Sequence, residues 1–209
     1  GAHALSRLVI CAGLQADLLA AAAGDAPAPE IIPFRGEYLR LRPHARDRVR
    51  RLIYPVPDPK YPFLGVHLTP RVNGESDLGP NAVLALAREG YRRRDIAAAE
   101  VIRLSRSGSF WKMALKNWQA GVREMRGSFF QGAFLAEART YLPWVTPADV
   151  MPAPAGVRAQ AVDRDGSLVD DFRITRAGDV TTVRNAPSPA ATASLAIAGH
   201  IVDQLDLRR

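Results

Sequence analysis

The sequence predicts a mixed α/β (α+β) fold in which both ends of the chain build one domain and the middle builds another. Residues 7–13 form a short apolar segment that ends in a glycine, and the helical pattern of residues 14–23 follows directly. Extended segments and then a long helical stretch occupy the middle of the chain. Strand-like segments and a final helix return near residue 153, so we expect the two ends to meet in space.

The first half of the middle region is expected to form one antiparallel sheet. Its predicted strands cover residues 31–41, 51–56, 63–69 and 76–86. The dipeptide Asn73-Gly74 is a strong hairpin signal between the last two of these strands.

A helical stretch is expected from about residue 95 to residue 142. Gly121, Gly127 and Gly132 are the predicted breaks between shorter helices, because glycine weakens a helix interior. The Trp and Phe side chains of this stretch are expected to belong to the core. A proline-rich turn at 151–154 then precedes further predicted elements, which are strands at 156–161, 168–175 and 180–184 and a helix at 189–207.

The composition is that of an ordinary globular protein. The chain has 209 residues, of which 47% are hydrophobic and 23% charged, and its formal net charge is +7. Only three of the 28 basic residues are lysines, and this arginine excess fits a GC-rich coding sequence better than a nucleic-acid partner. A single cysteine, Cys11, excludes an intrachain disulfide, and the four scattered histidines predict no metal site.

No uncharged apolar run in the sequence reaches the length of a membrane span, and no signal-peptide pattern is visible. We therefore expect a cytoplasmic protein. A peripheral contact with the inner membrane or with an electron acceptor stays open.

The junction from Asn185 to Thr192 is the most informative local feature. Ser188 is predicted to cap the last helix and Pro189 to occupy its first position, with small residues in the first turn. Small side chains let a flat ligand approach the backbone N–H groups, and a helix N-terminus favours negative charge. An ordinary capped helix packed on a sheet explains the same residues, so these residues alone leave both interpretations open.

Six motifs in order extend over nearly the whole chain and together resemble the L-2-hydroxyglutarate oxidase family, within the glycine oxidase and D-amino-acid oxidase class of flavoproteins. They are Ile32-Pro-Phe-Arg-Gly-Glu-Tyr38, Leu52-Ile-Tyr-Pro-Val-Pro-Asp58, Leu64-Gly-Val-His-Leu-Thr69, Gly79-Pro-Asn-Ala-Val-Leu-Ala-Leu86, Pro154-Ala-Gly-Val-Arg-Ala-Gln160 and Asn185-Ala-Pro-Ser-Pro-Ala-Ala-Thr192.

The resemblance implies a split Rossmann-like domain that binds FAD and a separate substrate domain with an antiparallel sheet. Residues 1–29 and 153–209 would belong to the first and residues 30–152 to the second. The implied reaction is oxidation of L-2-hydroxyglutarate to 2-oxoglutarate, with hydride transfer to flavin N5. No G-x-G-x-x-G fingerprint occurs in the chain. The FAD-binding domain is therefore expected to be incomplete, with the missing N-terminal half supplied in cis or in trans.

Within this resemblance, His67 is the candidate catalytic base, because imidazole titrates near neutral pH. The candidates for binding a dicarboxylate 2-hydroxy acid are Arg35, Tyr38, Asn81 and Arg158. The candidates for contacting FAD are Gly13, Gly156, Asn185, Ser188, Pro189, Ala190, Ala191 and Thr192.

Two alternatives remain at this stage. An enzyme of the same class could act on another small anionic substrate, such as glycerol 3-phosphate or an amino acid. The +7 charge would also suit a basic binding module without catalysis, although the strand pattern typical of RNA binders is missing.

Overall fold

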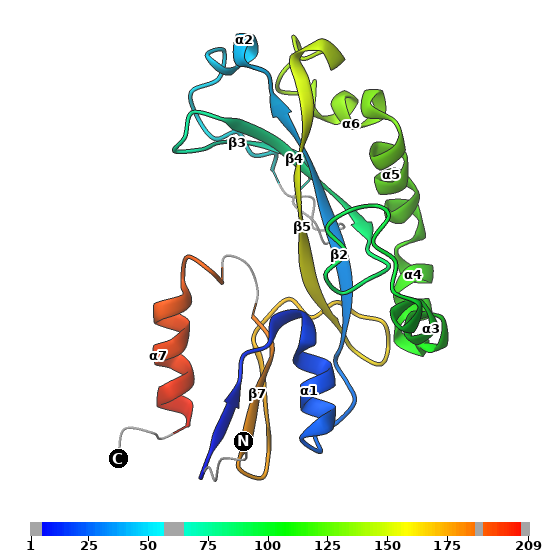
Figure 1. Ribbon diagram of the computed structural model, residues 1–209, viewed down its shortest axis with the longest axis vertical. Helices are drawn as coiled ribbons and strands as arrows, with labels where there is room; N and C mark the ends of the chain where they lie inside the picture. Colours follow the sequence, from blue (N-terminus) through cyan, green and yellow to red (C-terminus); the bar gives the residue numbers. More distant parts are fainter. Residues whose placement is uncertain (1–5, 57–64, 187–189, 206–209) are drawn as a thin grey trace.

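The computed structural model describes residues 6–56, 65–186 and 190–205. Two sheets organise the molecule (Figure 1). The larger one is antiparallel in the order β3-β4-β2-β5, formed by His67–Pro70, Ser76–Leu84, Glu30–Leu41 and Val150–Val162. This confirms the predicted antiparallel sheet. The hairpin between β3 and β4 turns at Gly74, whose φ of +79° suits glycine, as the Asn73-Gly74 signal predicts.

Two predictions for this part of the chain were wrong, one of a strand and one of a turn. The segment 51–56 is not a strand, because only Ile53 forms an isolated bridge, to Leu68. The expected proline-rich turn at 151–154 is instead part of β5, where Pro152 lies opposite Leu39 of β2. β5 is an edge strand with one unpaired side, so a proline that lacks an N–H group is tolerated there. The expected domain boundary after residue 152 stays a prediction, and β5 extends across it.

Four helices after the sheet confirm the predicted helical stretch. They are α3 (Ala98–Arg106), α4 (Gly108–Lys116), α5 (Trp118–Phe129) and α6 (Gln131–Ala138), and the short α2 (Pro43–Arg46) precedes them. The predicted glycine breaks were wrong, since Gly121 and Gly127 lie inside α5 and Gly132 inside α6. The helices change direction at Ser107, Asn117 and Phe130. The Ser107 side chain caps α4 by accepting from Phe110 N at 2.9 Å.

The core of the large sheet lies against α6 and the segment that follows it. Its buried members include Leu41, Leu68, Leu78, Phe134, Leu135, Leu142, Val145 and Val150. By contrast, Trp111, Trp118, Phe129 and Phe130 are exposed, so the expectation that the aromatic residues of the helical stretch form core was wrong for these four.

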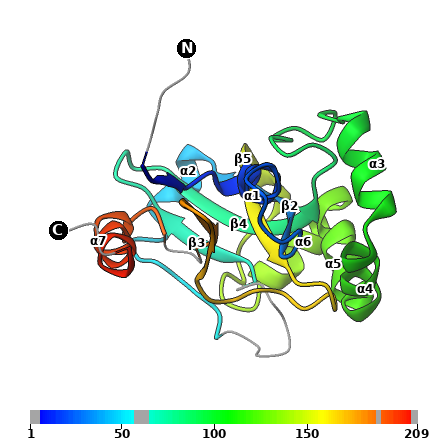
Figure 2. The same ribbon diagram turned by 90° about the horizontal axis from the view of Figure 1, so that it is seen from below.

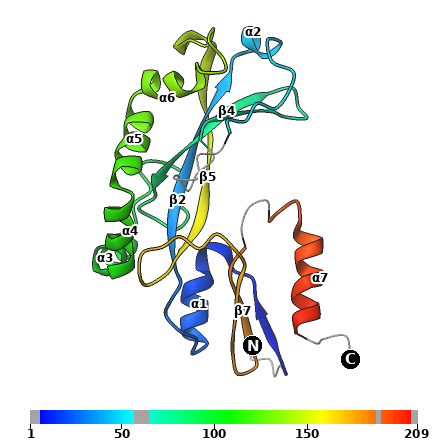
Figure 3. The same cartoon turned by 180° about the vertical axis from the view of Figure 1, so that it is seen from behind.

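The smaller sheet joins the two ends of the chain. β1 (Leu8–Ile10) pairs in parallel with β7 (Val180–Asn185), which pairs antiparallel with β6 (Arg173–Ala177). The prediction that the ends meet is therefore confirmed. The helices α1 (Ala16–Ala22) and α7 (Ser194–Gln204) flank this sheet on opposite sides (Figures 1 and 3). Seen from below, α7 and the helices α3 to α6 lie at opposite sides of the molecule (Figure 2).

Two boundaries at this end differ from the predictions. The strand expected at 168–175 begins only at Arg173, and Leu168 makes an isolated bridge to Val162. The last helix begins at Ser194 rather than Pro189, with Ala193 as its N-cap. Ser194 N reaches the Ala191 oxygen at 3.4 Å, an i to i−3 bond that makes residues 190–193 a turn. The predicted cap Ser188 and Pro189 lie outside the described residues.

The turn at residues 163–166 packs directly on α4, so a larger side chain in this turn should lower the stability of the protein. Gly166 has φ +83°, and a Cβ there would lie 2.6 Å from both Lys112 Cβ and Met113 N. Gly178 has φ +58° but meets nothing within 4 Å. We expect Gly178→Ala to cost about 1–2 kcal/mol through backbone strain alone, and Gly166→Ala to cost about 3 kcal/mol or more because an overpacking term adds to it. Urea denaturation of both variants measures the difference, and equal losses would contradict the packing argument.

Candidate functional site

His67 is buried at the start of β3, and its neighbours determine the chemistry of its ring. Its Nδ1 lies 3.1 Å from the Gly65 oxygen, and its ring stacks on Tyr54 with centroids 4.4 Å apart. Because a carbonyl oxygen only accepts, Nδ1 carries the proton and Nε2 keeps the lone pair. Burial lowers the pKa of His67, the Gly65 carbonyl opposes this shift, and the charge of Arg158 lowers the pKa further. The imidazole is therefore neutral at pH 7, as a general base must be.

The Tyr38 ring lies over a part of the large sheet that has no side chains of its own. His67 is paired across the strands with Gly79. A Cβ added to Gly79 would come within 2.8 Å of Tyr38 Cδ1, and one added to Gly36 would lie 3.7 Å from Tyr38 Cε2. The Tyr38 ring thus covers two glycines, one of which is the partner of His67.

Arg158 approaches the same place from β5. It is paired with Phe34, and Gly156 is paired with Gly36. Directly paired residues share a face, and so do residues two apart in one strand, so Arg158, Gly156 and Gly36 lie on one face of the sheet. Gly156 is exposed, and a Cβ there would meet nothing within 4 Å. The charge of Arg158 acts on His67, and Tyr38 covers the glycine that is paired with His67.

Arg35 and Asn81 lie on the opposite face. Arg35 follows Phe34 in β2 and is buried, with its Nη2 2.9 Å from Glu37 Oε1 and its Nη1 3.2 Å from the Arg92 oxygen. Asn81 is paired with Glu37 and donates from Nδ2 to the Glu124 oxygen at 3.0 Å. Burial favours the neutral form of Glu37, but bonds from Arg93, Ser128 and Arg35 outweigh it and lower the pKa of Glu37. The charge of Arg35 is thus already neutralised within the fold.

A cavity of about 690 Å³ opens beside Arg35 and Glu37, and its lining also includes Arg42, Tyr91 and Arg93. Tyr38 also borders it. Contacts of Arg35, Asn81, Tyr38 and Arg158 with a substrate all stay predictions.

Of the residues predicted to contact a cofactor, Gly13, Asn185, Ala190, Ala191 and Thr192 lie at one edge of the small sheet, whereas Gly156 lies in β5 of the large sheet. β1 and β7 are parallel neighbours, so both carboxyl ends lie at this edge, the usual ligand position in α/β sheets. Gly13 follows β1, is exposed with φ +51°, and has no atom within 4 Å of an added Cβ. After β7, the turn at residues 190–193 carries only Ala and Thr side chains. This edge carries small residues, and contact between it and a cofactor stays a prediction.

The Asn185 side chain, at the end of β7, is engaged in hydrogen bonds within the fold. Its Nδ2 donates to the oxygens of Val169 at 3.0 Å and Asp171 at 2.9 Å, so it fixes the segment that leads into β6. Its contact with a cofactor stays a prediction. Ser188 and Pro189, the other candidates in this motif, lie outside the described residues.

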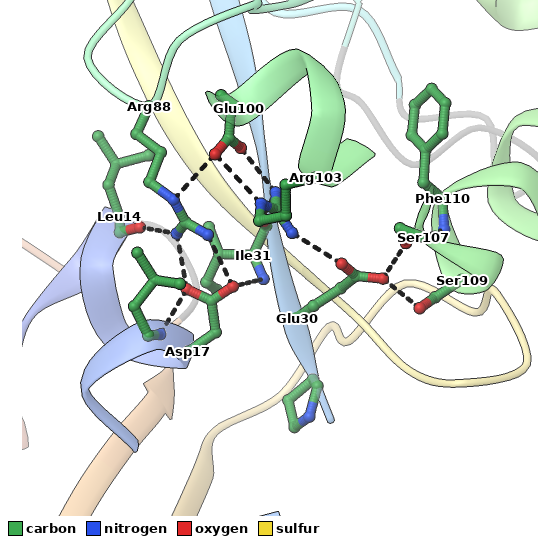
Figure 4. A network of polar contacts seen from close by, with 12 residues as sticks. Leu14, Asp17, Glu30, Ile31, Arg88, Glu100, Arg103, Ser107, Ser109 and Phe110 are labelled. Carbon is green, nitrogen blue, oxygen red and sulfur yellow. Dashed lines mark hydrogen bonds and ion pairs between the residues drawn. The ribbon is translucent and has the colours of Figure 1, made fainter. Parts of the chain in front are cut away.

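A buried ionic network that we did not predict connects the small sheet to the large one (Figure 4). Arg88 binds Asp17 of α1 at 2.6 and 2.9 Å, and its Nε lies 3.3 Å from Glu100 of α3. Arg103 binds Glu100 at 2.6 Å and Glu30 of β2 at 2.8 Å. The signal in the sequence was Asp17, a carboxylate within an otherwise apolar helix. The network ties α1, which follows β1 of the small sheet, to β2 of the large sheet.

Within the described parts of the chain, no three His, Cys, Asp or Glu side chains are placed to hold a metal ion. None of the helices described there has the length and apolar character needed to cross a bilayer.

Comparison with known proteins identifies the class. The family model described as "DAO: FAD dependent oxidoreductase" matches residues 1–204. The chain therefore belongs to the DAO family of FAD-dependent oxidoreductases, and this confirms the expected cofactor class, FAD.

Curated relatives give a narrower comparison. The chain is 48% identical over 206 residues to human mitochondrial L-2-hydroxyglutarate dehydrogenase, covering 96% of the chain and 44% of the relative. The L-2-hydroxyglutarate dehydrogenase of Salmonella houtenae is 46% identical over 202 residues, with coverage of 97% and 48%. The Escherichia coli K12 enzyme of this name is 43% identical over 205 residues, with coverage of 98% and 49%. The chain thus spans less than half the length of these relatives.

A solved structure confirms the fold class. FAD-bound, dithionite-reduced L-alpha-glycerophosphate oxidase from Mycoplasma pneumoniae matches 96% of the chain and 42% of its own, with a TM-score of 0.58 and 20% identity. At this identity the likeness concerns the fold alone.

Proposed function

We propose that these 209 residues form the flavin-ring and substrate half of an enzyme that oxidises L-2-hydroxyglutarate to 2-oxoglutarate. The observation that carries the proposal is His67, whose Nδ1 is engaged by the Gly65 carbonyl, which leaves Nε2 as a base, and whose pKa is lowered by burial and by the charge of Arg158. The identity of 43–48% to relatives named for this substrate supports the choice of substrate.

Each residue of the site has a task in this proposal. His67 Nε2 takes the proton of the substrate C2 hydroxyl as the C2 hydride departs. The Arg158 guanidinium forms a bidentate pair with a substrate carboxylate, and the Tyr38 hydroxyl donates a hydrogen bond to the same substrate. Bound FAD supplies the acceptor for the hydride, at flavin N5. The Tyr38 ring lies over Gly36 and Gly79, and the uncovered backbone at Gly156 leaves space beside it for the substrate.

The cofactor would be held by the carboxyl edge of the small sheet. Gly13 and Gly156 offer uncovered backbone, and the segment from Asn185 through Ser188, Pro189, Ala190, Ala191 and Thr192 offers small side chains and backbone N–H groups. The family's ADP-binding glycines are absent from these 209 residues. We propose that a further polypeptide segment supplies them, in cis or in trans.

We also propose a cytoplasmic protein with a peripheral contact at the inner membrane or with an electron acceptor.

The substrate is tested on the chain joined behind the N-terminal half of the Escherichia coli relative. Anaerobic addition of L-2-hydroxyglutarate should bleach the flavin and release 2-oxoglutarate, whereas D-2-hydroxyglutarate, glycerol 3-phosphate and amino acids should leave it yellow. If only one of the other compounds bleached the flavin, that compound would be identified as the substrate. A fused protein that binds FAD and is bleached by none of them would refute the proposed reaction.

The 209-residue chain alone is expected to retain FAD poorly, because most contacts to the pyrophosphate belong to the glycine fingerprint that it lacks. After gel filtration with excess FAD, visible absorbance should show far less than one flavin per chain, while the fused protein should retain about one. Stoichiometric flavin on the chain alone would show that the described edge of the small sheet is sufficient for binding.

A further inference from the structure

The peptide group between Gly65 and Val66 binds two side chains from opposite sides. Its carbonyl oxygen, on Gly65, lies 3.1 Å from His67 Nδ1, and its N–H group, on Val66, donates to Glu137 Oε1 at 3.0 Å. A trans peptide is planar, and its C=O and N–H groups point in opposite directions. The Glu137 carboxylate and the His67 ring are therefore connected through one rigid group.

Val66 immediately precedes β3, which is an edge strand of the large sheet. On the outer side of this strand, the backbone of Leu68 is bonded to Ile53 at 2.9 and 3.0 Å. Two residues earlier, the N–H group of Val66 binds Glu137 of α6, and its oxygen accepts from the Tyr141 hydroxyl. Val66 is buried, so both of these backbone groups need partners within the protein. Two side chains supply them in place of a neighbouring strand.

Gly65 makes the bond from Val66 N to Glu137 decisive for the orientation of this peptide group. Its φ is +70°, in the left-handed region, and glycine restricts the direction of the following peptide less than any other residue does. A Cβ at Gly65 would lie 2.8 Å from Glu137 Oε1. The carboxylate thus occupies the space beside the glycine, and its bond to Val66 N sets the direction of the Gly65 carbonyl.

The two side chains that hold Val66 are supported by their surroundings. Leu135 and Ala138 of α6 are fully buried, so the helix that carries Glu137 is fixed against the core of the large sheet. Burial and the charge of Glu137 raise the pKa of Tyr141, so its hydroxyl stays protonated and donates at neutral pH. The Glu137 side chain is exposed, so its replacement leaves no buried charge behind and should not unfold the chain.

We propose that Glu137 is a positioning residue for His67. By holding the Val66 N–H group, it keeps the Gly65 carbonyl directed at His67 Nδ1, which keeps the ring proton on Nδ1 and the lone pair on Nε2. If the peptide group could turn, the proton would be free to occupy Nε2, and the ring would have no lone pair for the substrate hydroxyl. The inference rests on the proposed role of His67 as the base, and it adds the group that selects the reactive nitrogen.

The tautomer of His67 can be measured by nitrogen-15 NMR of the 209-residue chain, at a pH above the ordinary histidine pKa of about 6.5. We expect wild-type His67 to carry its proton on Nδ1, and Glu137→Ala to populate the Nε2–H form as well. Glu137→Gln keeps an oxygen that can accept from Val66 N, so this variant should retain the wild-type tautomer. Glu89→Ala, at another exposed glutamate, is the matched control.

Turnover of the fused enzyme gives a second measurement of the same effect. Glu137→Ala should lower kcat on the order of tenfold, because a catalytic group that is held in the wrong state or place reacts slowly. KM and flavin content should stay near the wild-type values, and Glu137→Gln should recover most of the lost kcat.

A wild-type ring protonated on Nε2, or an unchanged Nδ1–H tautomer in Glu137→Ala, would overturn the proposal. So would a Glu137→Gln variant with the same mixture of tautomers as Glu137→Ala, because the charge of Glu137 and not its bond to Val66 would then be responsible. Circular dichroism of each variant confirms that it is folded. The tautomer is measured without flavin or substrate, so failure of this inference is distinct from failure of the proposed reaction, which turnover of His67→Ala tests.

Discussion

Replacing His67 by alanine is expected to lower turnover of L-2-hydroxyglutarate by about 100- to 10,000-fold, the usual contribution of a positioned general base. The flavin content of the fused enzyme should not change, because His67 belongs to β3 of the large sheet and not to the edge of the small sheet where the cofactor is proposed. Steady-state kinetics with a flavin spectrum of the same sample measure both quantities. His200→Ala, a change at an exposed histidine of α7, is the control. Turnover of His67→Ala within twofold of wild type would assign the base to another group.

The lowered pKa of His67 predicts how turnover depends on pH. Because burial and the Arg158 charge lower the pKa of His67, the base stays deprotonated until the pH falls below the ordinary histidine range. The acid limb of kcat should therefore lie below pH 6.5. Arg158→Gln should raise the His67 pKa, which proton NMR of the 209-residue chain can follow without any turnover. An unchanged or lower His67 pKa in this variant would contradict the proximity of the two side chains.

The second large effect is expected at Arg88. Arg88→Ala leaves Asp17 and Glu100 without their shared partner, and breaking a buried ion pair in this way costs about 3–5 kcal/mol. Urea denaturation followed by circular dichroism measures the loss. Arg51→Ala, at an exposed position, should change stability by less than about 0.5 kcal/mol. The double variant Arg88→Met, Asp17→Leu should regain much of the loss, because it removes both charges of the closest pair.

The loss of stability caused by Arg88→Ala should depend on pH. In the wild type, burial alone would raise the pKa of Asp17, but bonds from Arg88 and Ile31 N outweigh it and lower that pKa. At pH values above the unfolded pKa of 3.8, the lowered pKa of Asp17 stabilises the folded state. This stabilisation is lost as the pH falls through the folded pKa. Without Arg88 the burial effect dominates and Asp17 favours its neutral form. The difference in the free energy of unfolding between Arg88→Ala and wild type should therefore become smaller from pH 7 toward pH 4. A difference that stays constant over this range would contradict this account.

Local signals predicted much of the fold. Asn73-Gly74 placed a hairpin correctly, and the glycine-terminated apolar segment at the N-terminus indicated a partner strand near the C-terminus. The errors arose where position within a sheet mattered more than local preference. Pro152 and Pro154 are typical of a turn, but an edge strand such as β5 also tolerates them. Trp118 is typical of a core residue, but its neighbours in the fold leave it exposed.

The candidate site was predictable as a set of residue types but not as an arrangement. His67, Tyr38 and Arg158 come from three different strands, and only the register that aligns Gly79 with His67 and Gly156 with Gly36 brings them together. A bulge between Glu37 and Leu39 also changes the alternation of side chains next to Tyr38. Register and bulges depend on contacts between distant segments, which a single sequence does not display.

The parallel pairing of β1 with β7 has a consequence for how the chain acquires its structure during synthesis. Leu8 pairs with Val180, so this pairing cannot form until residue 180 has left the ribosome. The large sheet is complete at Val162 and can form before that moment, whereas the pairing of β1 with β7 must wait. A nascent chain released before residue 180 would therefore carry a folded His67 region without the β1–β7 pair.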